Sequence, residues 1–415
     1  MDKQTILYIS PSFPPLNSSA SIANAYYCQE LSRLGYRVIV LTAEIPSDHI
    51  SFQTNFRCTE VDVTVRRTDI GLYKRFYTRK ITGGNTNKTN NAGFSPYLKK
   101  IIKDFICIPD VFTFWASKSM KMAIQIMEEF APLIVITRSE PNSVHLLGAK
   151  LKKAYPQLQW IGYFGDPWSL EPSLNKTNRL IQHQLEKKVI HQMDRYVFTT
   201  DATRDLYSQK FGIPIQLTSV FSRGYDPEIY KLASTVKLEA KKIKFVYSGA
   251  IGRQRDISHF MSSVEEMKAQ LEEKALFYFV GSYTASIREK FAKYTFIRLP
   301  GFVTFEESIM YEKEADFLIL LDNKDGIQLP AKAFEYIGTN NPIITFITND
   351  ETPLSKLMRQ VGRGPISHND KDSISGTLSK AIELYENKGI AKQWRSVNTE
   401  FEISSVVKQF ALVNF

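Results

Sequence analysis

Cysteine is scarce in this sequence, and no long apolar run is present. The 415 residues include three cysteines, Cys28, Cys58 and Cys107, which are widely spaced and form no Cys-x-x-Cys pair. An odd, scattered set excludes a disulfide framework and predicts a reducing, cytoplasmic environment. No stretch reaches the ~18 consecutive apolar residues that a transmembrane helix needs. The apolar run near the N-terminus is too short for the core of a signal peptide.

Apolar residues and positive charge are abundant. Hydrophobic residues make up 43% of the chain, and 53 Lys and Arg against 43 Asp and Glu give a net charge of +10. At about 150 residues per domain, the length predicts two or three domains with full hydrophobic cores. A basic surface is typical of proteins that bind nucleic acid or anionic membranes. No nucleic-acid-binding module is visible among the basic stretches, so we expect no nucleic acid partner.

Apolar runs of strand length alternate with segments of helical spacing. This order predicts an α/β protein, because strand–helix–strand units form parallel, doubly wound sheets. We expect two Rossmann-like domains that face a cleft, over 1–215 and 216–392. The amphipathic segment 393–415 is expected to return as a helix toward the first domain, with packing on the second as the alternative. The predicted strands are 5–10, 38–42, 133–137, 160–164, 195–199, 244–248, 275–280, 295–299, 317–321 and 342–346, and the predicted helices include 21–34, 144–154, 202–210 and 258–272.

Polar residues and glycines follow the predicted strands, where open parallel sheets bind their ligands. A glycine there allows close backbone approach, and arginines suit phosphate oxygens. The alternatives are structural: helix N-caps for serines, threonines and acids, which are favoured for Thr200 and Asp201, and a glycine turn with solvated arginines. The candidate site residues are Ser18, Ser19, Arg138, Ser139 and Asp166 in the first domain, and Gly249, Arg253, Arg255, Asp322 and Gln328 in the second.

Segment 329–342 carries the most informative pattern. Pro330 suits the first turn of a short helix, and Gly338 or an asparagine suits a left-handed end. Lys332 and Glu335 are three residues apart and share a face of that helix. The helix N-terminus and Lys332 would meet the phosphates of a nucleoside diphosphate, and Glu335 its ribose hydroxyls. An ordinary surface salt bridge accounts for the same spacing equally well.

These motifs together resemble the family-4-like glycosyltransferases with the two-lobed B-type (GT-B) fold. The likeness covers most of the chain, and its most specific parts are Gly165-Asp166-Pro167-Trp168 and Lys332-Ala333-Phe334-Glu335-Tyr336-Ile337. The other matching parts are Tyr8-Ile9-Ser10-Pro11, residues 34–41, Ile108-Pro109-Asp110 with Trp115, Gly224-Tyr225-Asp226-Pro227-Glu228 and Ser248-Gly249.

The resemblance implies that the first domain binds the acceptor and the second a nucleotide-activated sugar. Glu335 matches the family's ribose-binding glutamate, and Lys332, Arg253 and Arg255 match basic positions near the diphosphate. The resemblance also implies that transfer retains the anomeric configuration and needs no metal or other cofactor. The helix end and the basic groups would neutralise the leaving diphosphate.

Two positions depart from the family pattern. Ile327 stands where many relatives have a second glutamate, eight residues before Glu335. Asp322, Asp325 or Gln328 would then take over contacts to the donor sugar. In the first loop, Ser18-Ser19 replaces a frequent glycine pair.

Asp166 is the residue we expect to act on the acceptor hydroxyl, which it would orient or deprotonate. It follows a predicted buried strand and precedes Pro167, which favours extended geometry at the aspartate. A positioned base accelerates such a reaction by roughly 10²–10⁴-fold. The alternative is that Asp166 caps a turn while Trp168 fills the core.

Two stretches, 72–80 and 97–105, place cationic and apolar residues side by side. We expect them to contact an anionic membrane surface, where a lipid-linked acceptor would lie, and this predicts peripheral attachment to the inner face of the membrane. A solvated run of charge that covers a helix is the alternative.

The sequence therefore predicts a glycosyltransferase that moves a sugar from a nucleotide-sugar donor to a hydroxyl of a glycan acceptor. A nucleotide-sugar epimerase of the same fold is one alternative, although an epimerase has no need of an acceptor pocket. A non-catalytic protein that binds nucleotide sugars is the other, and Ile327 favours it.

Overall fold

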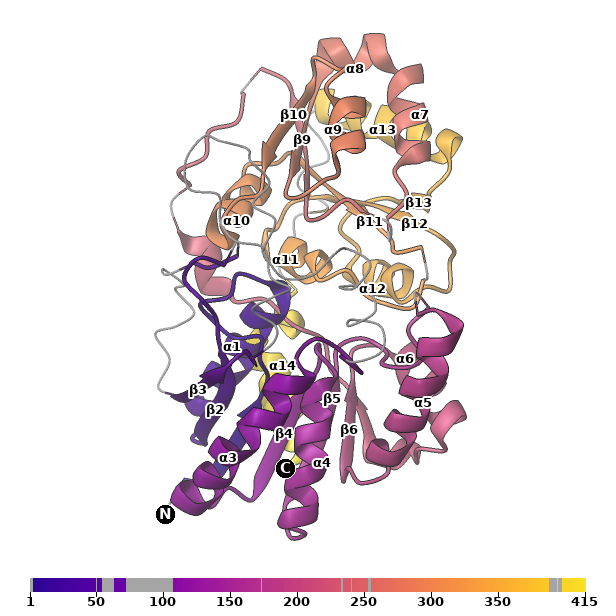
Figure 1. Cartoon of the computed structure of the whole chain (residues 1–415). Coiled ribbons are helices and arrows are strands. Elements are labelled where there is room, and N and C mark those ends of the chain that lie inside the picture. The colour runs from indigo at the N-terminus through magenta and orange to yellow at the C-terminus, as the bar shows by residue number, and fades with distance from the viewer. Residues whose placement is uncertain are drawn as a thin grey trace. The chain divides into compact units, whose positions relative to one another are not determined.

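The structure, a computed structural model, describes residues 3–49, 51–53, 63–71, 107–172, 174–232, 234–239, 241–252, 255–324, 326–387, 394 and 398–415. Cys58, Arg253, Asp325 and the basic stretches 72–80 and 97–105 lie outside these residues. Contacts divide the chain into a first unit, Met1–Phe221 with Val407–Phe415, and a second unit, Ser222–Val406 (Figure 1). None of the described helices is long and apolar enough to cross a bilayer.

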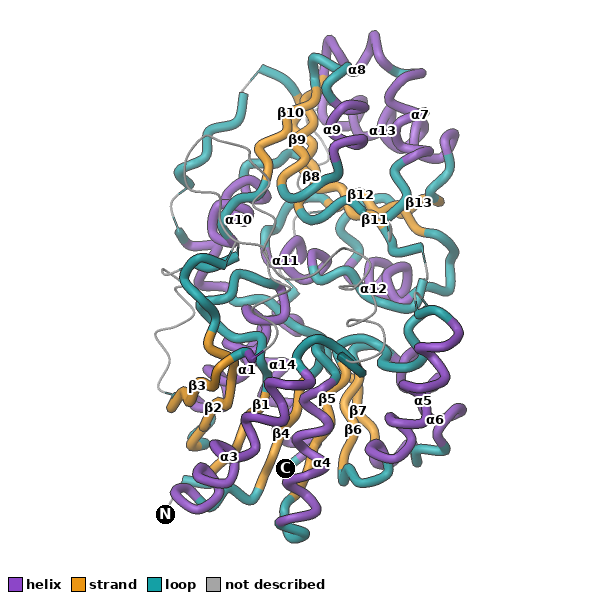
Figure 2. Tube along the Cα trace, viewed as in Figure 1, coloured by secondary structure: helices purple, strands orange, loops and turns teal. Residues whose placement is uncertain are grey.

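The first unit is built on a parallel sheet whose seven described strands follow the order β3-β2-β1-β4-β5-β6-β7 (Figure 2). Strand order reverses between β1 and β4, and this switch point is where doubly wound sheets bind ligands. The strands are β1 (Thr5–Ile9), β2 (Arg37–Glu44), β3 (Thr64–Asp69), β4 (Ile134–Arg138), β5 (Gln159–Phe164), β6 (Arg195–Phe198) and β7 (Thr218–Val220).

Side chains alternate between the two faces of this sheet. Thr137 of β4 bonds to His145 on one face, whereas Tyr163 of β5 packs against Phe410 on the other. Buried residues, most of them apolar, therefore run consecutively along the inner strands, as in sheets covered on both sides. The helices of this unit are α1 (Ser19–Arg33), α3 (Thr113–Phe130), α4 (Ser143–Ala154), α5 (Lys176–Ile190), α6 (Asp201–Phe211) and the end of α14 (Ile403–Asn414).

The second unit repeats this plan with six described strands in the order β10-β9-β8-β11-β12-β13, all parallel. Its switch point lies between β8 and β11. The strands are β8 (Ile243–Ser248), β9 (Ala275–Val280), β10 (Ile297–Gly301), β11 (Phe317–Leu321), β12 (Ile343–Ile347) and β13 (Ile366–His368). The helices are α7 (Ser258–Glu266), α8 (Lys268–Lys274), α9 (Ala285–Phe291), α10 (Phe305–Lys313), α11 (Lys332–Gly338), α12 (Pro353–Val361) and α13 (Lys371–Glu386).

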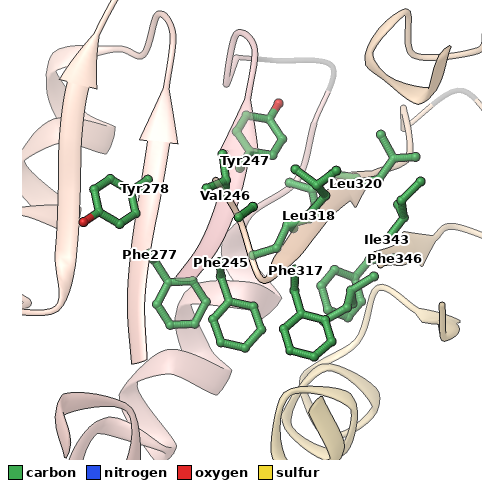
Figure 3. Packing of buried hydrophobic residues seen from close by; sticks show 14 of the residues in the cluster. Phe245, Val246, Tyr247, Phe277, Tyr278, Phe317, Leu318, Leu320, Ile343 and Phe346 are labelled. Carbon is green, nitrogen blue, oxygen red and sulfur yellow. The ribbon is translucent and has the colours of Figure 1, made fainter. Parts of the chain in front are cut away.

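Stacked rings fill the core of the second unit. Phe245 of β8 stacks on Phe277 of β9 at 4.8 Å between ring centroids and on Phe317 of β11 at 5.3 Å (Figure 3). All three side chains are buried. Such offset stacks add to the free energy of apolar burial by about 0.5–1.5 kcal/mol per pair.

The structure corrects three sequence predictions and decides between the two options of a fourth. The helix predicted over 258–272 is two helices, because the backbone of Met267 (φ −90°, ψ 9°) leaves helical values while the apolar spacing continues. Pro330 precedes α11 rather than opening it. Of the residues considered for the left-handed end, an asparagine, Asn340, takes that conformation, whereas Gly338 lies inside α11, where a Cβ would come within 2.4 Å of the Tyr230 ring. The last helix begins only at Ile403.

Candidate functional site

Two glycines meet at the switch-point side of the second sheet. Gly249 follows β8 with φ +133° and Gly281 follows β9 with φ +135°. A Cβ on Gly281 would lie 2.2 Å from the carbonyl oxygen of Gly249, so only glycine fits there. This close backbone approach joins two strand ends of the same sheet, whereas the approach predicted for Gly249 is to a bound ligand.

Arg255 supports the turn that follows Gly249. Its Nη1 donates to Tyr247 Oη at 2.8 Å and to the carbonyl oxygen of Ala250 at 2.9 Å. A Cβ placed on Gly249 would lie 3.4 Å from that nitrogen and 3.7 Å from Cγ of Lys332. The structure thus brings three predicted site residues, Gly249, Arg255 and Lys332, to one place.

Lys332 lies at the centre of a buried polar network. Its Nζ donates to Ser308 Oγ at 3.0 Å, to Glu312 Oε1 at 3.0 Å and to Glu335 Oε2. All three hydrogens of the ammonium group therefore have acceptors within the second unit. Lys332 holds Glu335 in position, and a phosphate could bind the ammonium only if one of these acceptors released it.

Burial and the neighbouring charges shift the pKa values of Lys332 and Glu335. Burial alone would lower the pKa of Lys332, but Glu312 and Glu335 outweigh burial and hold that pKa above its ordinary value. Burial raises the pKa of Glu335, and Lys332 opposes only part of that rise. The Lys332 ammonium thus pairs with two carboxylates, and Glu335 protonates more readily than an ordinary glutamate. These side chains are largely buried, so the surface salt bridge considered for Lys332 and Glu335 is not what the structure contains.

Glu312 is a site residue that sequence reasoning missed. It lies on α10 with a fully buried side chain, accepts hydrogen bonds from Ser248 and Ser308, and leaves Oε2 buried without a partner among the described residues. Its only signal in the sequence is an acid on the apolar face of a helix, next to Ser308 and Ile309. No motif marks it, because its partner Lys332 is distant in sequence.

Asp322 and Gln328 line the loop after β11. The Asp322 carboxylate accepts a bond from Asn323 N at 2.9 Å and, from Thr348, bonds from the backbone N and Oγ1 at 3.3 and 3.2 Å. Burial raises the pKa of Asp322. The carbonyl oxygen of Gln328 accepts a bond from Asn323 Nδ2 at 3.4 Å. Asp322 therefore fixes its own loop and ties it to the loop that follows β12.

The chain contains one Asp-x-Asp triplet, Asp370-Lys371-Asp372, whose carboxylates are of a type that can bind a metal ion. Here Asp370 is the N-cap of α13, and its two carboxylate oxygens accept bonds from the backbone N and Oγ of Ser373. Within the described part of the chain, no group of three His, Cys, Asp or Glu side chains could hold a metal ion.

In the first unit, the predicted serines have mainly structural roles. Ser18 is the N-cap of α1, and its hydroxyl accepts a bond from Ser21 N at 3.2 Å. Ser19 is the first residue of that helix. Thr200 caps α6, which confirms the capping interpretation of that residue. Asp201 is the first residue of α6 and pairs with Arg204.

The loops after β4 and β5 touch each other. Ser139 Oγ accepts a bond from Gly165 N at 3.2 Å, and a Cβ on Gly165 would lie 2.7 Å from the Ser139 carbonyl oxygen. This contact brings the predicted residues Arg138 and Ser139 next to Asp166, which is half-buried. Trp168 is buried in the core, as the structural alternative for this motif expects.

A buried glutamate on α5 holds the loop that carries Asp166. Glu186 accepts bonds from the backbone N and Oγ of Ser169, and from Tyr207 Oη at 2.7 Å, while that same Tyr207 oxygen accepts a bond from Trp168 N. Glu186 is fully buried, and burial raises its pKa to about 7. This residue, like Glu312, has no sequence motif.

The raised pKa of Glu186 predicts a pH dependence of stability. The folded protein binds a proton here more tightly than the unfolded chain, whose glutamate has a pKa near 4.5, so stability falls as pH rises from about 4.5 to 7. Glu186→Gln should remove about 1–3 kcal/mol of that fall. Urea unfolding at pH 5 and pH 7 measures it. Glu129→Gln, at a 53% exposed carboxylate paired with Arg66, is the control, and an equal fall in wild type and Glu186→Gln would contradict the prediction.

No family model and no curated protein matches this chain. Among solved structures, a glycosyltransferase from Rickettsia africae ESF-5 matches 100% of this chain and 98% of its own length, with 11% identity and a TM-score of 0.65. The E. coli protein described as trehalose-6-phosphate bound with UDP-2-fluoro glucose matches 99% and 98%, with 11% identity and a TM-score of 0.66. A putative UDP-N-acetylglucosamine 2-epimerase from Listeria monocytogenes matches 99% and 95%, with 12% identity and a TM-score of 0.59. The likeness establishes the fold: two Rossmann-like domains of the GT-B type, as the sequence predicted.

Proposed function

We propose that this protein is a glycosyltransferase that moves a sugar from a nucleotide-sugar donor to a hydroxyl of a glycan acceptor. The observation that carries the proposal is the network of Glu335, Lys332 and Glu312 beside Gly249, at the switch-point side of the second sheet. A carboxylate held by a buried lysine suits a pair of ribose hydroxyls, since charged acceptors make the stronger hydrogen bonds. The R. africae glycosyltransferase supports the reaction class, and the E. coli protein, bound with UDP-2-fluoro glucose, supports a nucleotide-sugar donor.

In the proposed reaction, Glu335 binds the ribose and the turn at Gly249 with Arg255 lies near the diphosphate. The main role of Lys332 is to hold the Glu335 carboxylate in position through a hydrogen bond. Asp166, on the loop held by Ser139 and Glu186, orients or deprotonates the acceptor hydroxyl. Retention of anomeric configuration and metal independence are part of the proposal, and both come from the family resemblance.

A lipid-linked acceptor, a cytoplasmic location and attachment to an anionic membrane surface also belong to the proposal. Their support is the net charge of +10 and the basic, apolar stretches 72–80 and 97–105. Each Lys or Arg near such a surface contributes about 1 kcal/mol to attachment.

An epimerase is the second candidate, because the L. monocytogenes protein shares the fold over nearly its whole length. A screen of mixed nucleotide sugars, with and without glycan acceptors, separates the candidates. Transferase activity releases nucleoside diphosphate and extends an acceptor. An isomerised donor without acceptor would instead identify an epimerase, and binding without turnover would identify a non-catalytic binding protein.

A further inference from the structure

Arg138, the last residue of β4, is a buried cation among aromatic rings. Its side chain is 4% exposed. Its Cζ lies 4.3 Å from the ring centroid of Tyr27 and 4.0 Å from that of Tyr163, and these rings are nearly perpendicular to each other. Tyr8 contributes a third ring, whose hydroxyl accepts a bond from Nη1 at 3.4 Å.

No carboxylate among the described residues pairs with Arg138, and the bond to Tyr8 is the only hydrogen bond of its guanidinium there. A guanidinium carries five N–H donors, so four of them have no acceptor in this part of the chain. Buried charges in proteins are normally paired, because removal of an ion from water costs several kcal/mol. Contacts between a desolvated cation and aromatic rings contribute about 2 kcal/mol, which offsets only part of this cost.

Arg363 of the second unit is also buried, and both of its Nη atoms have acceptors, whereas its Nε has none among the described residues. It donates to the carbonyl oxygens of Ile337 and Asn341, where α11 ends and β12 approaches. Both Nη atoms of Arg363 are therefore engaged in bonds to the backbone, which is a structural role. Arg138 therefore differs from Arg363: each Nη atom of Arg363 has a carbonyl acceptor, whereas no carbonyl or carboxylate group among the described residues accepts a bond from Arg138.

The position of Arg138 suits a ligand. It ends β4 beside the switch point with β1, where Ser12 of the neighbouring loop donates to the carbonyl oxygen of Glu140 at 3.4 Å. The next residue, Ser139, bonds to Gly165, the neighbour of Asp166. A group bound at Arg138 would thus lie close to the loop proposed to act on the acceptor hydroxyl.

We propose that Arg138, within its cluster of Tyr8, Tyr27 and Tyr163, binds an oxyanion of the acceptor substrate, a phosphate or carboxylate. The acceptor is then an acidic sugar or a sugar phosphate rather than a neutral glycan. This inference rests on the proposed function, since it assigns the acceptor to the first unit. An arginine presents paired donors that match the two oxygens of either group.

Binding to the full-length protein tests the proposal, with glucose 6-phosphate and glucuronate as acidic probes, inorganic phosphate as the free anion, and glucose as the neutral control. Ionic strength is held constant with chloride. Titration calorimetry should detect the acidic sugars with wild type and not glucose. Arg138→Met should weaken that binding roughly 10- to 100-fold, as the loss of hydrogen bonds to a charged group predicts.

Arg37→Met is the matched control. Arg37 lies over the Phe130 ring at 4.7 Å in the same unit, so this variant also removes one cation held against an aromatic ring. It should leave binding unchanged. Equal weakening in both variants, or none in Arg138→Met, would overturn the proposal and leave Arg138 a structural residue. Binding of inorganic phosphate without either acidic sugar would assign Arg138 to a free anion and overturn the acceptor assignment.

If Arg138→Met fails to fold, a measurement on the wild-type protein still tests the proposal. In protein labelled with ¹⁵N-arginine, buried guanidinium Nε–H signals exchange slowly with water. Glucose 6-phosphate should shift the signal of Arg138 and leave that of Arg363 in place, and no shift at Arg138 would count against the site. Donor turnover is assayed separately, so an anion site without transferase activity would refute the proposed function alone.

Discussion

Asp166→Asn should lower the rate of sugar transfer by roughly 10²–10⁴-fold while the protein stays folded. The amide keeps the size of the side chain and loses its ability to take a proton or hold a charged hydrogen bond. Glu186 fixes the loop that carries Asp166 through hydrogen bonds from Ser169 and Tyr207, so the substitution should not displace the backbone. Steady-state kinetics with the acceptor found in the nucleotide-sugar screen measures the effect.

Asp201→Asn is the control for this variant. Asp201 follows the neighbouring strand β6 and is 71% exposed, so its carboxylate has an ordinary surface role. Its turnover should match wild type. If Asp166→Asn also turns over within a few-fold of wild type, with an unchanged circular dichroism spectrum, Asp166 has no part in the chemistry.

Glu335→Gln should lower kcat/KM for the nucleotide-sugar donor by about 10²–10⁴-fold. Two hydroxyl donors to a charged acceptor are worth about 1.5–3 kcal/mol each, and their loss accounts for that range. Calorimetry with the nucleoside diphosphate should register a similar loss of affinity, since the contact is to the ribose. Glu351→Gln, at an 85% exposed carboxylate, should change neither quantity.

The pKa of Glu335 adds a pH signature to this variant. Burial raises that pKa above its ordinary value near 4.5, and the ionised form is the one that accepts both hydroxyls. Donor affinity should therefore increase as pH rises through the raised pKa, and Glu335→Gln should be flat over the same range. A pH-independent affinity in wild type would contradict a ribose contact at this carboxylate.

Much of the fold follows from local patterns in the sequence. Strands that are buried on both faces, such as β1, β9 and β11, appear as unbroken apolar runs, so their positions were predicted closely. The strand β3 was missed because it lies at the sheet edge and is only half-buried, with the sequence Thr-Val-Arg-Arg-Thr-Asp. Its pairing with β2 is visible only in the folded sheet.

The candidate site was predicted less completely, for a physical reason. Spacing reveals pairs on one helix, such as Lys332 and Glu335, but not partners brought together by the sheet. Glu312 reaches Lys332 across 20 residues, and Tyr8 reaches Arg138 across 130. The sequence therefore placed Lys332 and Arg138 in segments that follow strands. That Glu312 neutralises Lys332, and that only a tyrosine hydroxyl accepts a bond from Arg138 among the described residues, is visible only in the structure.

The helix α14 has a consequence for biosynthesis. Phe410 packs against Tyr27, Tyr163 and Phe221, and Asn414 bonds to Ser219, so the core of the first unit is completed by residues 407–415. A ribosome that adds 5–20 residues per second needs about 10–40 s to pass from residue 222 to residue 406. During that interval the aromatic rings of the first sheet lack their covering helix, so their apolar surface stays exposed until translation reaches α14.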